Sequence, residues 1–202
     1  MKIGIFGGTF DPPHLGHKNA LKAMLDNIEL EKIYVIPVFL PPHKNLHSNV
    51  SPKMRLEMTK IAFKSLSKKI EISDLEIKRQ GMSYTAYTIE YFKNQGHDIY
   101  FLCGTDMFLT LDTWYKPRYI FANSTIVLVR REDSEEISKK VLEKAQEYKD
   151  VFDAKIIILS AEAFEASSTD VRMLINSGED HHKILSDEIY DYIIANNLYR
   201  NE

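Results

Sequence analysis

Residues 2–17 read KIGIFGGTFDPPHLGH, and this stretch contains the clearest local signal of the fold class. A short apolar run passes through a glycine turn and a polar stretch into a segment with helical spacing, which predicts a strand, a turn and a helix in succession. Gly7 and Gly8 let backbone N–H groups approach a ligand with no Cβ in the way. The N-terminus of the following helix presents unpaired donors and partial positive charge, so the junction suits a phosphate.

The same alternation of strand and helix continues along the chain. Compact runs rich in Ile, Val, Tyr and Phe predict strands at Lys2–Phe6, Lys32–Val38, Ile70–Leu75, Asp98–Cys103, Thr125–Arg130 and Lys155–Leu159. Helical spacing predicts helices at Leu15–Asn27, Pro52–Ser67, Thr85–Gln95, Ser134–Lys149, Thr169–Ser177 and Asp187–Asn197. Such alternation implies a doubly wound α/β fold, a mostly parallel sheet with helices on both faces. Ligands then bind at the carboxyl ends of the strands.

Composition and charge narrow the class of protein. A chain of 202 residues favours one domain spanning residues 1–202. The 26 Lys and Arg residues against 29 Asp and Glu give a net charge of −3, which argues against nucleic acid or an anionic membrane as a partner. The single cysteine, Cys103, cannot form an internal disulfide, and no apolar run reaches the length of a membrane span. We therefore expect a soluble, cytoplasmic protein.

Two histidines lie at the expected start of the first helix. His14 and His17 are three residues apart, so one helix face can aim both rings at the same anion. Neither G-x-x-x-x-G-K-[ST] nor G-x-G-x-x-G is present. A zinc site needs at least one more ligand at suitable spacing, and no Cys or carboxylate cluster supplies it, so we predict no metal ligands. The alternative is a turn with two incidental histidines.

A second polar segment follows the last expected strand, where residues 166–172 read ASSTDVR. Ser168 or Thr169 is a natural N-cap, and Arg172 lies four residues beyond Ser168. Hydroxyl, free amides and guanidinium can therefore converge on one anion. Taken alone, such a segment is more often a simple cap followed by a solvated arginine, so its functional interpretation depends on the first motif.

Six motifs, in order, resemble those of bacterial nicotinate-nucleotide adenylyltransferases, a family of the nucleotidyltransferase superfamily. They are GGTFDPPHLGH at 7–17, PPHK at 41–44, GMSYTAYT at 81–88, GTD at 104–106, TWYK at 113–116 and SSTDVR at 167–172. The first and last are shared across the superfamily, whereas PPHK with G-x-SYT-x-x-T narrows the match to this family. The resemblance covers essentially the whole chain and implies the Rossmann-like nucleotidyltransferase fold.

The resemblance implies transfer of AMP from ATP, with Mg²⁺, to nicotinate mononucleotide, giving nicotinate adenine dinucleotide and pyrophosphate in NAD biosynthesis. The phosphate of the mononucleotide has a second pKa of about 6, so at neutral pH it is mostly dianionic and needs no protein base. Catalysis can then depend on holding two anions in line and neutralising the charge that builds at the α-phosphorus and on pyrophosphate.

Roles for individual residues also follow from the resemblance. The implied ATP-binding residues are Gly8, Thr9, Phe10, His14, His17, Gly104, Asp106, Ser168, Thr169 and Arg172. His14, His17 and Arg172 are the implied catalytic residues, with His17 at the α-phosphate, and Gly104 and Asp106 are expected at the adenosine ribose. The implied substrate-binding residues are Lys44, Ser83, Tyr84, Thr85 and Trp114, with Trp114 stacking on the pyridine ring.

Other functions stay open as alternatives. A phosphopantetheine adenylyltransferase shares the His-x-Gly-His chemistry but gives no reason for PPHK. A class I aminoacyl-tRNA synthetase needs a K-M-S-K-S-like loop and a tRNA-binding region, which the chain lacks. A nucleotide sensor would keep the pocket without turnover. A homo-oligomer is open, Cys103 is interpreted as a packed thiol, and His43 is a candidate contact. No role follows for His47, His97, His181 or His182.

Overall fold

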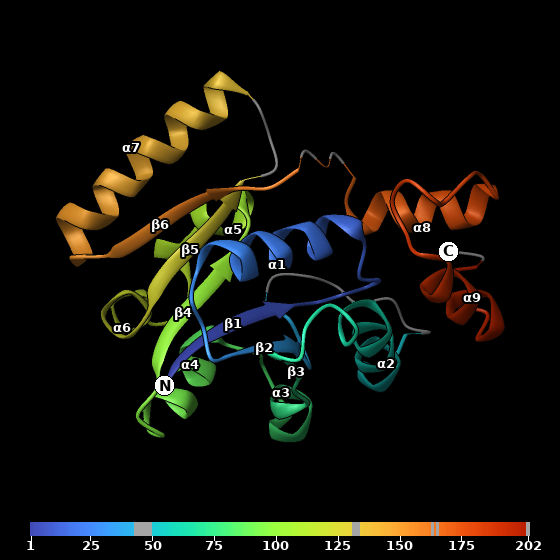
Figure 1. The fold of residues 1–202 in the computed structure, drawn as a ribbon, viewed down its shortest axis with the longest axis horizontal. Helices are drawn as coiled ribbons and strands as arrows, with labels where there is room; N and C mark the ends of the chain where they lie inside the picture. Colours follow the sequence, from blue (N-terminus) through green and yellow to red (C-terminus); the bar gives the residue numbers. More distant parts are fainter. Residues whose placement is uncertain (43–49, 131–133, 163, 165, 201–202) are drawn as a thin grey trace.

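The computed structural model describes residues 1–42, 50–130, 134–162, 164 and 166–200. Six strands form one sheet in the order β3-β2-β1-β4-β5-β6 (Figure 1). They are β1 (Lys2–Gly8), β2 (Lys32–Pro37), β3 (Ile70–Ile72), β4 (Asp98–Cys103), β5 (Thr125–Arg130) and β6 (Lys155–Ser160). Every neighbouring pair is parallel, which confirms the predicted doubly wound α/β fold.

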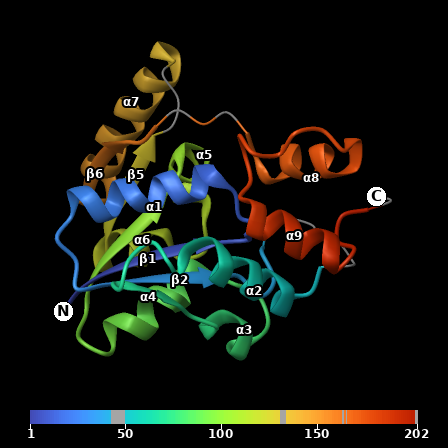
Figure 2. The ribbon, with the colours of Figure 1, turned by 45° about the vertical axis from the view of Figure 1, so that its right-hand side comes forward.

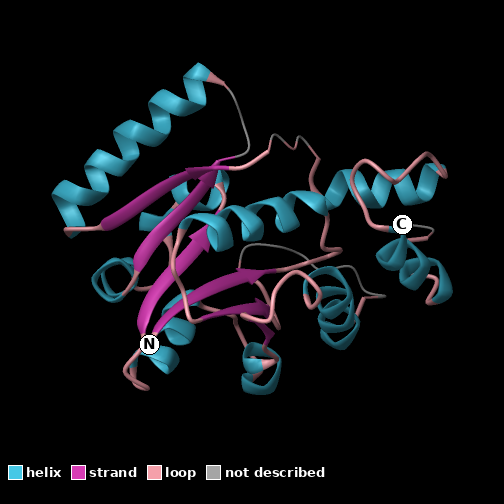
Figure 3. Cartoon of the chain, viewed as in Figure 1, coloured by secondary structure: helices cyan, strands magenta, loops and turns pink. Residues whose placement is uncertain are grey.

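Helices connect the strands and cover the sheet (Figure 3). The longer ones are α1 (Leu15–Asn27), α2 (Pro52–Phe63), α4 (Thr85–Lys93), α7 (Glu135–Phe152), α8 (Ser168–Ser177) and α9 (Asp187–Ala195). Shorter ones are α3 (Leu75–Arg79), α5 (Thr105–Leu109), the 3-10 turn η1 (Leu111–Thr113) and α6 (Pro117–Asn123). Within the described residues, no helix is both long and apolar enough to cross a membrane.

The order of the strands reverses at the centre of the sheet. From β1 the chain moves outward through β2 to β3, then returns to β4 on the other side of β1 and moves outward to β6. In a doubly wound sheet the connections after the two central strands leave on opposite faces, which opens a crevice at their carboxyl ends. The ends of β1 and β4 are therefore where a ligand is expected.

Two apolar clusters fill the two faces of the sheet. Leu21 and Met24 of α1 pack with Phe63 of α2 on one face. Ile89 of α4 and Tyr148 of α7 lie in the cluster on the other face. The prediction of helices on both faces is thus confirmed, and the alternating side chains of the strands supply both clusters.

A third apolar cluster lies beyond the carboxyl edge of the sheet, where α8 and α9 pack beside α2 (Figure 2). It contains Met58 of α2, Val171 of α8, Ile189 and Ile193 of α9, and the buried ring of Tyr199. Packing in this cluster brings the start of α8 next to the start of α1, so residues far apart in the chain meet at one place.

Some predicted boundaries were wrong. The third strand ends at Ile72 rather than Leu75, because Leu75 begins α3. The segment after the fourth strand, for which no helix was predicted, contains α5, η1 and α6. Helices of three to seven residues are too short to show an apolar period, so the pattern could not reveal them.

Candidate functional site

The turn after β1 is tightly built around an aromatic ring. A Cβ at Gly8 would lie 2.7 Å from the ring of Phe10, so only glycine fits there. Phe10 itself is buried, has a positive φ of 49° and meets Phe6 and Phe63 edge to face. A Cβ at Gly7 would meet nothing within 4 Å, so backbone at this position is open to approach. The turn is therefore rigid on one side and accessible on the other.

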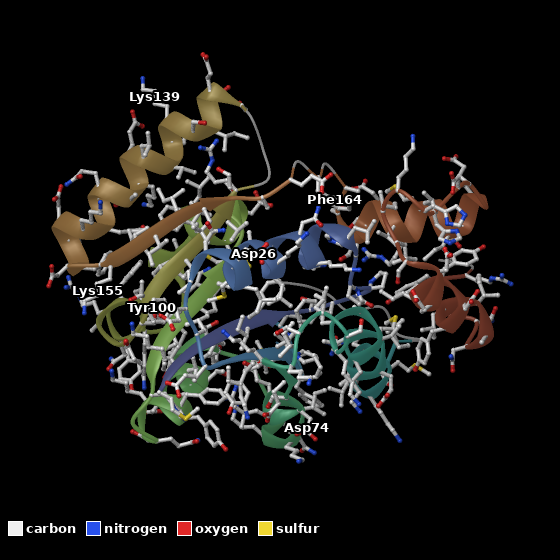
Figure 4. All side chains as sticks on the ribbon, viewed as in Figure 1. Asp26, Asp74, Tyr100, Lys139, Lys155 and Phe164 are labelled. Atoms are coloured by element: carbon white, nitrogen blue, oxygen red, sulfur yellow. The ribbon has the colours of Figure 1, made fainter. Side chains whose placement is uncertain are left out.

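The two histidines of the first motif lie together at the start of α1. His14 is the N-cap, and its ring centroid lies 3.7 Å from that of His17. The ring of Phe164, from the loop before α8, stacks on His14 at 5.1 Å and 8° (Figure 4). The His14 backbone N–H donates to Nδ1 of His17 at 3.2 Å, which places the proton of a neutral His17 ring on Nε2. His17 thus presents a fixed donor; its contact with phosphate stays a prediction.

The start of α8 differs in one respect from the prediction. Ser167, not Ser168 or Thr169, is the N-cap: its hydroxyl accepts from the Asp170 N–H, and the Asp170 carboxylate accepts from the Ser167 N–H. This reciprocal capping box satisfies two end groups of the helix at once. Ser168 and Thr169 could not form it, because neither has an acidic residue three positions further on. The bonds from Ser167 also lower the pKa of Asp170.

Two predicted residues of α8 contact the turn after β1. The Ser168 hydroxyl donates to the Pro12 carbonyl at 3.0 Å. Arg172 donates from Nη1 to the Asp11 carbonyl at 2.7 Å and from Nη2 to the Thr169 hydroxyl at 2.9 Å. The first and last motifs therefore form one site, as Figures 1 and 2 show for the starts of α1 and α8.

Arg55 of α2 is a structural residue of this site that the sequence analysis missed. Its guanidinium is fully buried and donates from Nη1 to the Thr9 and Val38 carbonyls at 2.9 and 2.7 Å, and from Nη2 to the Phe39 carbonyl at 3.0 Å. Burial lowers the pKa of Arg55, while the nearby Asp11 carboxylate opposes this. One side chain thus joins the turn after β1 to the connection after β2.

A second missed contact joins the C-terminal segment to the same turn. The Tyr199 hydroxyl donates to Oδ1 of Asp11 at 2.6 Å, and both side chains are buried. Burial raises the pKa of Tyr199, and the Asp11 carboxylate raises it further. Tyr199 therefore fixes the position of the Asp11 carboxylate. Side chains from α2, α8 and the C-terminal segment together fix the turn after β1.

The start of α4 lies beside the connection after β2. The Ser83 hydroxyl is buried and accepts from the Phe39 N–H at 2.9 Å, so this predicted substrate-binding side chain has a structural partner. Tyr84 is the N-cap of α4 and Thr85 its first residue. Through Phe39, this helix start is joined to Arg55 and hence to the turn after β1.

Trp114 follows η1 and lies next to an aromatic group at the surface. It is half-buried and meets Phe101 edge to face at 6.3 Å, so it packs on the core, and its stacking on a pyridine ring stays a prediction. The Tyr115 ring lies 4.5 Å from that of Tyr84, which brings the GMSYTAYT and TWYK motifs together. The Lys116 ammonium lies 5.3 Å from the Tyr115 ring and adds positive charge at the rim.

The end of β4 lies next to the end of β1 because the two strands are parallel neighbours. Gly104 is the N-cap of α5, and Asp106 is exposed in its first turn. Cys103 is buried, and burial raises the pKa of its thiol, which agrees with a packed side chain. The predicted substrate-binding residue Lys44 and the candidate contact His43 lie outside the described residues.

Comparisons with known proteins agree with this arrangement. The cytidylyltransferase-like family model matches residues 5–174. A relative from Clostridium botulinum (strain Alaska E43 / Type E3), named a probable nicotinate-nucleotide adenylyltransferase, is 36% identical over 202 residues, which make up 100% of this chain and 99% of the relative. This chain belongs to the nicotinate-nucleotide adenylyltransferase family.

Other members support the family assignment. A probable nicotinate-nucleotide adenylyltransferase of Caldicellulosiruptor saccharolyticus is 31% identical over 200 residues, covering 99% of this chain and 100% of that protein. The fold is also that of Plasmodium falciparum nicotinic acid mononucleotide adenylyltransferase complexed with NaAD, with a TM-score of 0.76 at 23% identity, over 98% of this chain and 97% of that one. The cytidylyltransferase-like family model ends at residue 174, before α9, so Tyr199 lies outside the matched range.

Proposed function

We propose that this chain is a cytoplasmic enzyme that transfers the adenylyl group of ATP to nicotinate mononucleotide, releasing pyrophosphate and forming nicotinate adenine dinucleotide for NAD biosynthesis. The observation that carries the proposal is the pair His14 and His17 at the end of β1, joined to the start of α8. Full-length similarity to nicotinate-nucleotide adenylyltransferases supports the choice of acceptor.

The chemical step is an in-line displacement at phosphorus. An oxygen of the mononucleotide phosphate forms a bond to the α-phosphorus of ATP, and the bond from that phosphorus to the β-phosphate oxygen breaks. The bonding pair leaves on pyrophosphate, so no proton has to be removed from the nucleophile. The protein therefore has to position two anions and stabilise charge that grows in the transition state.

His17 is the residue best placed to stabilise charge at the α-phosphate. The hydrogen bond from the His14 backbone to Nδ1 fixes the orientation of the His17 ring, and we propose that its Nε2–H donates to an oxygen of the reacting phosphate when ATP is bound. The start of α8 brings Ser168, Thr169 and Arg172 to the same side for the β- and γ-phosphates. Because Arg172 also bonds the Asp11 carbonyl, the two phosphate-binding segments keep a fixed separation.

Magnesium fits this scheme as part of the substrate. Mg²⁺ prefers oxygen ligands and usually binds through substrate phosphates, water and one or two carboxylates. Across the part of the chain that the structure describes, no group of three or more His, Cys, Asp or Glu ligands includes His14 or His17. We therefore propose that Mg²⁺ arrives with ATP and neutralises its phosphates, while the chain supplies the cationic and N–H donors around them.

A pyrophosphate-release assay tests the proposed activity. Purified protein is incubated with ATP and Mg²⁺ and with nicotinate mononucleotide, nicotinamide mononucleotide or phosphopantetheine in separate reactions. We expect release with nicotinate mononucleotide and identification of nicotinate adenine dinucleotide by mass. Release with phosphopantetheine alone would make the chain a phosphopantetheine adenylyltransferase. Nucleotide binding without release in any reaction would make it a sensor.

A further inference from the structure

The connection between α8 and α9 holds two histidines and two aspartates in contact. Asp180, His181 and His182 each offer one ligand atom, and these atoms lie within 4.8 Å of one another. Asp187, the first residue of α9, places Oδ1 3.2 Å from Nε2 of His181 and 2.9 Å from Nδ1 of His182. Both imidazole rings therefore point at the same carboxylate oxygen, in a segment that the adenylyl transfer does not use.

Packing orients His181, whereas the side chains of Asp180, His182 and Asp187 are 67%, 65% and 68% exposed and are oriented by hydrogen bonds. The His181 ring stacks on Tyr190 of α9 at 3.8 Å and 4°, and its side chain is only 14% exposed. The His182 N–H donates to Oδ1 of Asp180 at 3.0 Å, and the His181 carbonyl accepts from Leu185 at 2.9 Å. The turn and the start of α9 thus bring the four side chains together, and the ligand atoms of Asp180, His181 and His182 all lie within 4.8 Å of one another. The packed ring of His181 loses little rotational freedom when a ligand binds.

We propose that Asp180, His181, His182 and Asp187 form a binding site for a transition-metal cation of the Zn²⁺ type. Two imidazole nitrogens with carboxylate oxygens suit Zn²⁺, whereas Mg²⁺ and Ca²⁺ prefer oxygen alone. Ligands about 2.0–2.1 Å from a tetrahedral zinc ion lie about 3.3 Å from one another. The separations of 3.2 and 2.9 Å at Asp187 are close to this value.

The site would act on the structure rather than on the chemistry. The carbonyl of Ile184, within the same turn, accepts from the Leu15 N–H at 3.0 Å, directly after His14. Leu185 and Ile189 bury their side chains in the cluster shared by α2, α8 and α9. A metal ion bound here would therefore hold the turn and the start of α9 in place and stabilise the folded chain, since a ligand that binds only the folded state raises stability.

Metal titration of the full chain tests the proposal. We expect one equivalent of Zn²⁺ to bind by calorimetry, Co²⁺ to give a visible absorption spectrum of a nitrogen- and oxygen-ligated ion, and Zn²⁺ to raise the Tm. His182→Ala and Asp180→Asn should each weaken binding by more than about tenfold. Glu179→Gln removes the same charge from the exposed neighbouring residue and should change affinity only on the order of twofold, because exposed charges are screened.

The His14 and His17 pair provides a second comparison, because it also brings two imidazoles together. A His17→Ala variant should keep the Co²⁺ spectrum and the Zn²⁺ stoichiometry if the metal binds between α8 and α9. Loss of the spectrum in this variant would place the metal at α1 and overturn the proposal. Equal affinity of wild type and His182→Ala, equal losses in Asp180→Asn and Glu179→Gln, or no binding by wild type would overturn it too.

Discussion

The two ends of the candidate site are held in different ways. The end that we propose binds phosphate, here called the phosphate end, is formed by Thr9–His17 and Ser167–Arg172, and its backbone carbonyls are bonded by buried or half-buried side chains from α2 and α8. At the end that we propose binds the pyridine ring, here called the pyridine end and formed by Ser83–Tyr87 and Trp114–Lys116, the aromatic rings contact one another near the surface, and the hydroxyls of Tyr87 and Tyr115 bond each other at 3.1 Å.

This difference separates two tasks. A preorganised phosphate end places donors where charge develops, so changes there should lower kcat. An aromatic surface can adjust to a planar ring, so changes at the pyridine end should act on acceptor affinity and choice. The predictions below test this separation.

The largest expected effect is at His17. His17→Ala should lower kcat by about 10²-fold or more, since one donor to transition-state charge commonly contributes about 2.7–4 kcal/mol. Steady-state kinetics with saturating nicotinate mononucleotide measures it, and circular dichroism checks the fold. His17→Gln, whose amide can donate from a place near Nε2, should recover part of the loss. Near-normal turnover in the alanine variant would make His17 only a part of the turn.

The next effect concerns the choice between acid and amide. The first turn of α4 leaves backbone N–H groups without helical partners, and a carboxylate can accept from two of them while an amide must turn its NH₂ toward one. We expect kcat/KM to favour nicotinate mononucleotide over nicotinamide mononucleotide by at least roughly 10²-fold.

A proline at Thr85 tests which group reads the carboxylate. Thr85 is the first residue of α4, where proline is tolerated, and Tyr84 before it has the extended backbone that proline requires. Thr85→Pro removes the N–H and should reduce the preference, whereas Thr85→Ala keeps the N–H and should preserve it. An unchanged ratio of the two kcat/KM values in the proline variant would show that the Thr85 N–H does not read the carboxylate.

Arg55 tests how strongly the phosphate end is held. Lysine keeps the charge but cannot reach the Thr9, Val38 and Phe39 carbonyls with a planar fork. Arg55→Lys should lower the free energy of unfolding by about 2–3 kcal/mol, the scale of lost hydrogen bonds to a charged group. Urea denaturation measures it. Arg118→Lys, at an exposed residue whose guanidinium lies over the Phe152 ring, is the matched control and should cost less than about 0.5 kcal/mol.

Much of the architecture was predictable because its signals are local. Strands with compact apolar runs and helices with long apolar periods were found, and the two histidines are only three residues apart. Arg55 could have been suspected from its spacing, since it lies three residues before Met58 and helical periodicity places both on one face of α2. The Asp11–Tyr199 bond spans 188 residues, and no spacing rule reaches across that separation. The capping by Ser167 had a sequence signal that could have found it, because only Ser167 of the three adjacent hydroxyl residues has an acidic residue, Asp170, three positions on.

Tyr199→Phe tests the remote support of the same end. Removing the hydroxyl leaves the buried Asp11 carboxylate without that donor, and we expect a loss of about 1.5 kcal/mol in the free energy of unfolding at pH 7. Tyr91→Phe, at an exposed ring, is the control and should be near neutral.

The pH dependence of this pair gives a second measurement. The pKa of Tyr199 is raised in the folded state, whereas an unfolded tyrosine has a pKa of about 10. Its stabilising contribution is therefore complete below about pH 10 and decreases as the pH rises beyond that value. The stability difference between wild type and Tyr199→Phe should shrink above about pH 10, and a difference that stays constant would contradict the assignment.

The smallest expected effect is at Trp114. It tests whether the pyridine end contributes affinity for the mononucleotide without distinguishing the acid from the amide. Replacing a stacked aromatic side chain by alanine costs about 1–3 kcal/mol of binding free energy. Trp114→Ala should therefore raise the KM for both mononucleotides by about tenfold. Because a ring face cannot distinguish a carboxylate from an amide at the ring edge, the ratio of the two kcat/KM values should remain.

Trp114 also packs on Phe101, so part of any loss could come from the core. Trp114→Phe separates the two contributions, since a phenyl ring can keep both the packing and a weaker stack. We expect it to retain the wild-type Tm within a few degrees and an intermediate KM. A ratio that collapses in Trp114→Ala while the Tm holds would place the choice of acceptor on the tryptophan and remove the distinction between the start of α4 and the aromatic surface.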